Sequence, residues 1–235
     1  MKIGLFTDPH YCKTENLGGG RKPQEAFDKI KNAMLDFINQ EVEIIFCLGD
    51  LIDYIEGTEK ESVKADLNEV TSIIKGSKIP FYLIPGNHDF LKLTREDFVK
   101  NGIKLPPYTL KRQNLTFIAL DANYRSSMNH FDTEGVDWMD SNLPENQICF
   151  LKDAIRKAEG ECVVLIHESL DPTICESHLV KNASQIREAI EKNGKVKMVI
   201  QGHFHDGKET LVNGIPYKTV PAMCENGTHQ IIEIL

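Results

Sequence analysis

Five short clusters of Asp, Asn and His side chains follow five separate apolar segments of this 235-residue sequence. Runs rich in β-branched residues predict these segments as strands, at residues 2–7, 43–48, 81–84, 162–166 and 196–200. The clusters are Asp8 and His10, Asp50 and Asp53, Asn87 with His88 and Asp89, His167, and His203 with His205. Because open α/β sheets gather their ligands at the carboxyl ends of strands, we expect the five clusters to form one site.

The spacing within two of the clusters suggests how their side chains converge. Residues i and i+2 of an extended segment project to the same side, so Asp8 and His10 can face one site, with Pro9 restraining Asp8 to an extended backbone. His203 and His205 repeat this spacing. Their separation of about 7 Å along the chain suits two adjacent ions. Glycines at 49, 86 and 202 are expected to let the backbone approach the site closely.

The remaining pattern indicates a mixed α/β protein. Apolar residues at helical spacing predict four helices. One begins at Pro23, one carries Val63 to Ile74, and two cover about 147–158 and 183–192. A further strand is predicted at 115–120, a hairpin around Asn213-Gly214, and a last strand at 230–235. Without a linker or repeat, residues 1–235 are predicted to form one domain, with 124–145 as a long loop or small insertion.

Charge and cysteine content exclude several classes of protein. The formal net charge of −8 argues against broad binding to nucleic acid or anionic lipid, which needs clustered Lys and Arg. The six cysteines include no pair at CxxC spacing, so reduced thiols and a cytoplasmic location are expected. No apolar run approaches the roughly 18 residues of a membrane span, so we expect no membrane association.

Taken in order, the clusters resemble the signature blocks of the calcineurin-like metallophosphoesterase superfamily. The matching blocks are Asp8-x-His10, Gly49-Asp50-x-x-Asp53, Gly86-Asn87-His88-Asp89, His167 and Gly202-His203-x-His205. This resemblance implies a four-layer α/β/β/α sandwich with two mixed sheets. It also implies that Asp8, His10 and His205 bind one metal ion, that Asn87, His167 and His203 bind another, and that Asp50 bridges the two.

The resemblance also implies a mechanism. His88 would stabilise the leaving oxygen as a general acid, and Asp53 would fix its tautomer by accepting the other N–H. Two divalent or mixed-valence ions would lower the pKa of a bridging water, and the resulting hydroxide would attack phosphorus. Imidazole and carboxylate ligands favour Mn or Fe, with Zn or Ni as further candidates, over the all-oxygen coordination of calcium.

Within the superfamily, the chain resembles the branch that acts on cyclic nucleotides and nucleotide diphosphates. The resemblance rests on two features: the chain has little beyond the catalytic core, and Trp138 is followed by Gln147-x-x-x-Leu151. The expected reaction is therefore hydrolysis of a phosphodiester or pyrophosphate bond in a small molecule such as a nucleotide. Competing functions are those of a phosphomonoesterase, including a protein phosphatase, a nuclease, and a non-catalytic scaffold. The presence of His88 and every expected ligand argues against the scaffold.

Several residues near these blocks allow more than one interpretation. Asp53 is also compatible with a helix N-cap, and Asp89 with either orienting a histidine or completing a turn. Arg21, after three glycines, could bind a second phosphate or lie in a flexible surface loop. His130, His178, His229, Asp121 and Asn123 are expected to be structural or surface residues. His167-Glu168-Ser169 departs from the superfamily, where Pro often follows the histidine closely, and leaves that loop's shape open.

Overall fold

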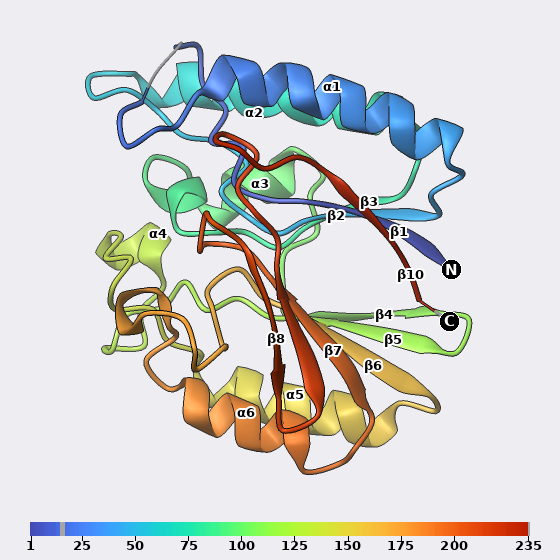
Figure 1. Ribbon diagram of the computed structural model, residues 1–235. Helices are drawn as coiled ribbons and strands as arrows, with labels where there is room; N and C mark the ends of the chain where they lie inside the picture. Colours follow the sequence, from blue (N-terminus) through green and yellow to red (C-terminus); the bar gives the residue numbers. More distant parts are fainter. Residues whose placement is uncertain (15–16, 235) are drawn as a thin grey trace.

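Two β-sheets packed face to face form the centre of the structure, and helices cover their outer surfaces (Figure 1). The computed structural model describes residues 1–14 and 17–234. Three clusters of buried apolar side chains separate the layers, one between the sheets and one beneath each helical layer. This arrangement confirms the four-layer α/β/β/α sandwich that the resemblance implies.

The first sheet contains the amino-terminal strands and the last strand of the chain. Its members are β1 (Lys2–Phe6), β2 (Ile44–Cys47), β3 (Phe81–Leu83) and β10 (Gln230–Glu233), in the order β10-β1-β2-β3. β1, β2 and β3 run parallel, whereas β10 pairs antiparallel with β1. The carboxyl ends of the three parallel strands therefore meet at one edge of this sheet.

The second sheet is also mixed. Its members are β4 (Tyr108–Arg112), β5 (Leu115–Ala119), β6 (Glu161–Leu165), β7 (Val196–Gln201), β8 (Lys208–Val212) and β9 (Ile215–Thr219), in the order β4-β5-β6-β7-β9-β8. The central strands β5, β6, β7 and β9 run parallel, and β4 and β8 pair antiparallel at the two edges. The predicted hairpin joins β8 to β9, with positive φ angles of 49° at Asn213 and 83° at Gly214, as a type I′ turn requires.

Four longer helices form the outer layers. α1 (Pro23–Asn39) and α2 (Lys60–Gly76) cover the first sheet, and α5 (Glu145–Lys157) and α6 (Ala183–Glu191) cover the second (Figure 1). Pro23 stands at the first turn of α1, where its missing N–H costs no hydrogen bond. The buried side of α1, with Phe27, Ile30 and Phe37, packs into the core cluster beneath it because these residues share one helical face.

Outside residues 124–145, β4 and α3 were not predicted from the sequence. β4 alternates buried and exposed positions at a sheet edge, and its Tyr-Thr-Leu-Lys-Arg sequence lacks the apolar run that marks the central strands. α3 (Arg95–Lys100) is short and depends on a capping box between Thr94 and Asp97. The residues at 124–145 are irregular apart from α4 (Phe131–Glu134) and the start of α5.

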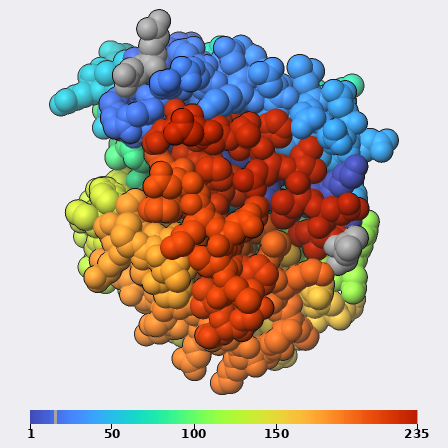
Figure 2. All heavy atoms as spheres, in the orientation of Figure 1, coloured from blue at the N-terminus to red at the C-terminus, as the bar shows by residue number. Residues whose placement is uncertain are grey.

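The chain after β7 links the two sheets. β9 belongs to the second sheet and β10 to the first, so this segment crosses from one to the other, and it covers much of the face seen in Figure 2. Both chain ends lie on one side of the molecule, and α4 lies on the opposite side (Figure 1). All six cysteines are free thiols, and within the described residues no helix has the length and apolar content to cross a membrane.

Candidate metal centre

The segments that follow β1 and β2 stay paired beyond the ends of the strands. The backbone N–H of Asp8 donates to the carbonyl of Gly49 at 2.9 Å, and that of His10 donates to the carbonyl of Asp50 at 2.9 Å. Tyr11 and Ile52 then form a parallel bridge. Because the two segments run side by side and pair residue by residue, Asp8 and His10 lie next to Asp50 and Asp53.

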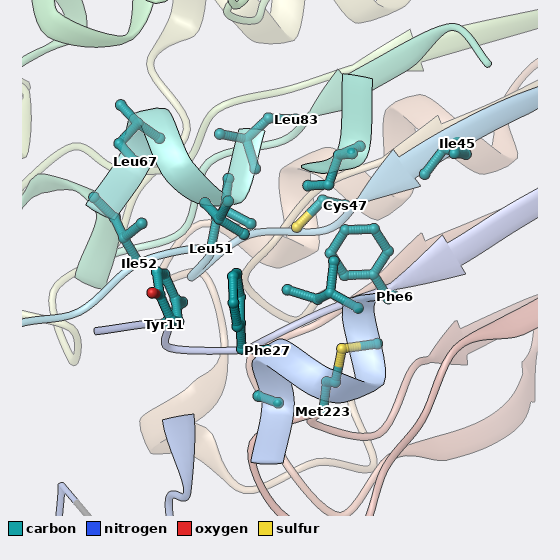
Figure 3. Close-up of a cluster of buried hydrophobic side chains, with 14 of the residues drawn as sticks. Phe6, Tyr11, Phe27, Ile45, Cys47, Leu51, Ile52, Leu67, Leu83 and Met223 are labelled. Carbon is teal, nitrogen blue, oxygen red and sulfur yellow. The ribbon is translucent and has the colours of Figure 1, made fainter. Parts of the chain in front are cut away.

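Residues between the candidate ligands anchor these segments in the core. Tyr11, Leu51 and Ile52 are buried in the cluster drawn in Figure 3, under α1 and α2. The Tyr11 ring stacks on Phe27 of α1 with centroids 4.4 Å apart. Met223, which precedes Cys224, belongs to the same cluster. Alternating polar and apolar residues therefore fix the site loops, with the apolar side chains held by helix packing.

The prediction of an extended backbone at Asp8 and His10 is wrong. Both have left-handed backbones, with φ angles of 50° and 47°, and Asp50 and His203 share this conformation at 49° and 65°. Such angles cost roughly 1–2 kcal/mol for residues with a Cβ. Hydrogen bonds compensate here, since the carboxylate Oδ2 of Asp8 accepts from the backbone N–H of His203 at 3.2 Å. Asp8 and His10 meet through tight turning of the chain, and Pro9 does not keep Asp8 extended.

Close backbone approach at the predicted glycines is confirmed. Gly49 has a φ of 109°, and a Cβ there would lie 2.2 Å from Nδ1 of His167. A Cβ at Gly86 would lie 2.3 Å from Oδ1 of Asp50 and 2.5 Å from Nε2 of His167. A side chain at either position would displace a candidate ligand.

Asp8, His10 and His205 form the first group of candidate ligands. Nε2 of His10 lies 3.3 Å from Nε2 of His205, and Oδ1 of Asp8 lies 3.5 Å from Nε2 of His205 and 3.8 Å from Nε2 of His10. Atoms that each bind one ion at about 2.1 Å stand roughly 3–4 Å apart. The three side chains therefore have the spacing of a single metal site.

Asp50, His167 and His203 form the second group. Their donor atoms lie within 4.8 Å of one another, and Oδ2 of Asp50 is 3.5 Å from Nε2 of His167. The same Asp50 oxygen lies 3.6 Å from Nε2 of His10, in the first group. Asp50 is therefore the residue common to both groups. Its other oxygen accepts the backbone N–H of His88 at 2.7 Å.

Four buried polar atoms at this site have no hydrogen-bond partner among the described residues. They are Oδ1 of Asp8, Oδ1 of Asn87, Nε2 of His167 and Nε2 of His203. A buried polar atom without a partner costs free energy comparable to a lost hydrogen bond. Each of these atoms is a lone-pair donor suited to a divalent cation, and together with Asp50 they fit a metal centre.

The second ring nitrogen of three histidines is held by an acceptor. Nδ1 of His167 lies 2.5 Å from the carbonyl oxygen of Leu48, Nδ1 of His205 lies 2.5 Å from Oε1 of Glu225, and Nδ1 of His10 lies 3.0 Å from Oδ2 of Asp53. Protonation at Nδ1 leaves the Nε2 lone pair directed into the site. Metal-binding histidines usually have such a partner, because it fixes the tautomer and the ring orientation.

Glu225 was not identified from the sequence, since an isolated Glu in a loop carries no motif. The ammonium group of Lys29, on α1, donates to the carbonyl oxygens of Met223, Glu225 and Gly227 at 2.6–3.0 Å. These three bonds order the loop that carries Glu225. Lys29 of α1 therefore holds the loop whose Glu225 side chain contacts Nδ1 of His205.

Beside the two ligand groups lies a cluster centred on Asp53. Its Oδ2 atom lies 2.9 Å from Nδ1 of His88, 3.0 Å from Nδ1 of His10 and 2.9 Å from a guanidinium nitrogen of Arg21. Its Oδ1 accepts the backbone N–H of Tyr54 at 2.8 Å. Asp53 is not a helix N-cap, because α2 begins only at Lys60. Arg21 also lies 3.5 Å from both ring nitrogens of His88. These contacts at the site contradict the interpretation of Arg21 as part of a flexible surface loop.

The charges at the site shift several pKa values. Burial alone would lower the pKa of His88, but the carboxylates of Asp50 and Asp53 outweigh it and raise the pKa above its ordinary value. Burial would raise the pKa of Asp53, yet hydrogen bonds from His10 and His88 hold it well below the usual range. His88 is therefore favoured in its protonated form, and Asp53 stays ionised.

Contacts decide the roles of Asp89 and of the five residues expected to be structural or surface residues. Asp89 completes the turn: Oδ2 accepts the N–H of Gly86 at 2.9 Å and Oδ1 accepts that of Ile52 at 3.2 Å. Four of the five residues are held by structural contacts. Asp121 binds His130 and Arg95, Asn123 donates to the carbonyl of Pro85 at 2.9 Å, and His229 lies 2.8 Å from Asp36. His178 is the exception, because it lines the cavity beside the ligands.

Two further buried residues beside the ligands were missed by sequence reasoning. The Cys224 sulfur lies within 4.8 Å of donor atoms of His10 and His205, and burial raises the pKa of this thiol. Glu168, next to His167, is buried with neither carboxylate oxygen bonded to a described residue, and burial raises its pKa to about 7. Ser169 ties that loop to β7, since its Oγ accepts from Nε2 of Gln201 at 2.7 Å.

A cavity of about 400 Å³ opens over the two ligand groups. It is lined by Asp50, Asn87, His88, Trp138, His178, His203, Phe204, His205 and Asp206. A larger depression of about 720 Å³, between β4 and α5, contains none of the candidate ligands. Only the smaller cavity combines candidate metal ligands with the raised pKa of His88, which are features of a reaction site.

A family model for calcineurin-like phosphoesterases matches residues 1–207. The 3′,5′-cyclic adenosine monophosphate phosphodiesterase of Haemophilus influenzae is 25% identical over 229 residues, which cover 95% of this chain and 77% of the relative. A probable cyclic nucleotide phosphodiesterase of Fibrobacter succinogenes is 23% identical, over 87% of this chain and 73% of its own.

Among solved structures, a dimetal phosphatase of Danio rerio superposes with a TM-score of 0.79. The superposition covers 95% of this chain and 88% of that chain, at 16% sequence identity. This likeness supports the fold described above.

Proposed function

The chain belongs to the calcineurin-like phosphoesterase family, whose fold implies a dinuclear divalent metal centre, and we propose that it hydrolyses a phosphodiester or pyrophosphate bond of a small molecule such as a nucleotide. Family membership makes the chain a metal-dependent phosphoric ester hydrolase. The choice of a diester over a monoester is supported by the names of its relatives, which include cyclic nucleotide phosphodiesterases.

Each ion is assigned a set of ligands in this proposal. Asp8, His10 and His205 would hold one ion, Asn87, His167 and His203 the other, and Asp50 both. Support comes from the 3.3–3.8 Å spacing of the first group and from Asp50, whose Oδ2 lies 3.5–3.6 Å from a histidine of each group. The mixture of imidazole, carboxylate and amide oxygen favours Mn or Fe, and also fits Zn.

The residues beside the ligands would supply the remaining chemistry. When bound, the two ions would neutralise charge on the phosphoryl oxygens and lower the pKa of a water between them. His88, which lines the cavity, would donate a proton to the leaving oxygen. Asp53 would hold the His88 ring through Nδ1, which leaves Nε2 as the atom available to the substrate.

One observation carries the proposal. A carboxylate shared by two histidine-containing groups lies beside an Asp53–His88 pair, and His88 and members of both groups line a single cavity. A metal site that served only stability would have no use for a histidine that lines the same cavity and is oriented by a buried carboxylate. Protein phosphatase and nuclease activity would need a larger binding surface than this cavity, and the net charge of −8 also argues against nucleic acid.

The test is hydrolysis of two chromogenic substrates by the metal-reconstituted protein. Bis(4-nitrophenyl) phosphate reports diester cleavage, and 4-nitrophenyl phosphate reports monoester cleavage. We expect a higher kcat/KM for the diester, with His88→Ala as the variant that loses activity and His229→Ala, placed away from the cavity, as its matched control. A preference for the monoester, or turnover of neither substrate by protein that contains both ions, would contradict the proposal.

A further inference from the structure

We propose that Trp138, His178 and Phe204 form an aromatic wall that binds the nucleobase of a nucleotide substrate. The wall lines the cavity that also exposes Asn87, His88 and His203. The inference deepens the proposed function and rests on it for the identity of the reacting group. It assigns a role to Trp138 and His178, which lie outside the signature blocks, and to Phe204, the variable position of Gly202-His203-x-His205.

The three rings are packed edge to face. The Trp138 and His178 ring centroids lie 5.2 Å apart with an interplanar angle of 61°, and those of His178 and Phe204 lie 5.5 Å apart at 90°. Trp138 also lies 5.9 Å from the ring of His203, a candidate metal ligand. The aromatic wall therefore directly adjoins a candidate metal ligand.

Trp138 combines exposure with a fixed backbone. Its side chain is 38% exposed, which is unusual for the largest apolar residue in a chain that buries most of its aromatic rings. The turn that carries it is bound on both sides: Asp137 pairs with Arg125 at 3.3 Å, and Asp140 accepts from Ser126 N–H and Oγ at 3.0 Å. An exposed ring on an ordered turn is suited to stacking, because little conformational freedom is lost on binding.

The charge of the cavity favours a neutral planar group over a second anion. Among the described residues that line it, none is Lys or Arg, and Asp206 adds a negative charge at the exposed rim. A second phosphate at this end of the cavity would have no Lys or Arg partner among the described lining residues. Base–aromatic stacking requires only a π-face and contributes roughly 1–3 kcal/mol per base. The volume of about 400 Å³ also falls within the range of small-molecule sites.

The sequence contains one tryptophan, so intrinsic tryptophan fluorescence reports on Trp138 alone. The first experiment titrates metal-loaded protein with adenosine 5′-monophosphate and, in parallel, with ribose 5-phosphate, which lacks the base. We expect quenching of the emission by the nucleotide and little change with the sugar phosphate. Equal responses to the two ligands would overturn the inference.

The second experiment measures nucleotide affinity by calorimetry in Trp138→Leu and Phe204→Leu. Loss of stacking predicts a Kd for adenosine 5′-monophosphate that is roughly 5- to 150-fold higher in Trp138→Leu, with the Kd for ribose 5-phosphate unchanged. Met139→Ala is the matched control, since Met139 is exposed in the same turn but does not line the cavity. An unchanged nucleotide Kd in Trp138→Leu, or an equal loss of nucleotide affinity in Met139→Ala, would refute base binding by the aromatic wall.

The inference and the proposed function fail in different ways. The protein could hydrolyse bis(4-nitrophenyl) phosphate without distinguishing the nucleotide from the sugar phosphate. That result would refute base binding by the aromatic wall and leave the proposed phosphodiesterase activity supported. If the nucleotide quenches the fluorescence of Trp138 but the metal-loaded protein cleaves no diester, base binding by the aromatic wall is supported and the proposed reaction is wrong.

Discussion

Oδ2 of Asp53 lies 2.9 Å from Nδ1 of His88, and the same oxygen lies 3.0 Å from Nδ1 of His10. One carboxylate thus orients both a proposed metal ligand and the proposed general acid. The two roles can be separated by substitution, because His88 is not in either proposed ligand group.

For His88→Ala we expect kcat to fall about 10²- to 10⁴-fold, the range of a lost general acid, with both ions retained. For Asp53→Asn we expect a fall in kcat together with weaker metal binding, since the neutral amide holds Nδ1 of His10 less strongly than the carboxylate does. Steady-state kinetics and elemental analysis of the same samples measure both effects. Loss of metal in His88→Ala equal to that in Asp53→Asn would show that His88 is a ligand.

Arg21 is the third partner of Asp53. We expect Arg21→Ala to lower kcat about 10- to 100-fold, because a charge-assisted hydrogen bond to the carboxylate is removed, and Arg21→Lys to restore part of the activity. Kinetics with the diester substrate measure this, and Lys22→Ala, which is exposed and next in sequence, is the control. An increase in KM with unchanged kcat would instead assign Arg21 to substrate binding, as the second-phosphate interpretation of its sequence suggests.

Gly49→Ala tests the close approach of backbone to ligand. The new Cβ would lie 2.2 Å from Nδ1 of His167 and displace that ring from the carbonyl of Leu48. We expect loss of the ion assigned to Asn87, His167 and His203, and a decrease of about 1–3 kcal/mol in the free energy of unfolding. Gly57→Ala is the matched control: its φ is 89° but no atom lies within 4 Å of the new Cβ, so strain without the clash should leave the metal content unchanged.

His130 predicts a pH dependence of stability away from the metal centre. Burial would lower its pKa, but Asp121 and Asp132 outweigh burial and raise the pKa above 6.5. A raised folded-state pKa means that the imidazolium stabilises the fold below about pH 6.5 and that this contribution disappears as pH rises through the folded-state value. The difference in unfolding free energy between wild type and His130→Phe, from urea titrations, should therefore be larger at about pH 6 than at about pH 9. A difference that grows with pH would contradict this sign.

The sequence predicts the layer architecture and the convergence of the candidate ligands, because both depend on patterns with a local signature. Strand ends, the Gly-Asn-His-Asp block and the Asn213-Gly214 turn each have residue types that specify a backbone or a chemistry. The edge strand β4 was missed because two of its five residues are exposed to solvent and interrupt the apolar pattern. The left-handed backbone of Asp8 was missed because it is imposed by bonds to Gly49 and His203, which come from other parts of the chain.

The residues that support the site were also beyond sequence analysis. Glu225 acts through Nδ1 of His205 and depends on a loop held by Lys29, 196 residues away along the chain. Trp138 and His178 lie far apart in sequence and meet only where the irregular segment 124–145 folds against the loop after β6. Contacts of this kind leave no spacing pattern, so only the three-dimensional structure reveals them.

The central claim is a pair of cations that share Asp50. Elemental analysis of metal-replete protein, in wild type and in Asp50→Asn, tests it most directly. We predict two divalent ions per chain in wild type and at most one in Asp50→Asn, because the carboxylate oxygen lies 3.5–3.6 Å from a histidine of each group. Full occupancy in Asp50→Asn, or fewer than two ions in replete wild type, would contradict the account.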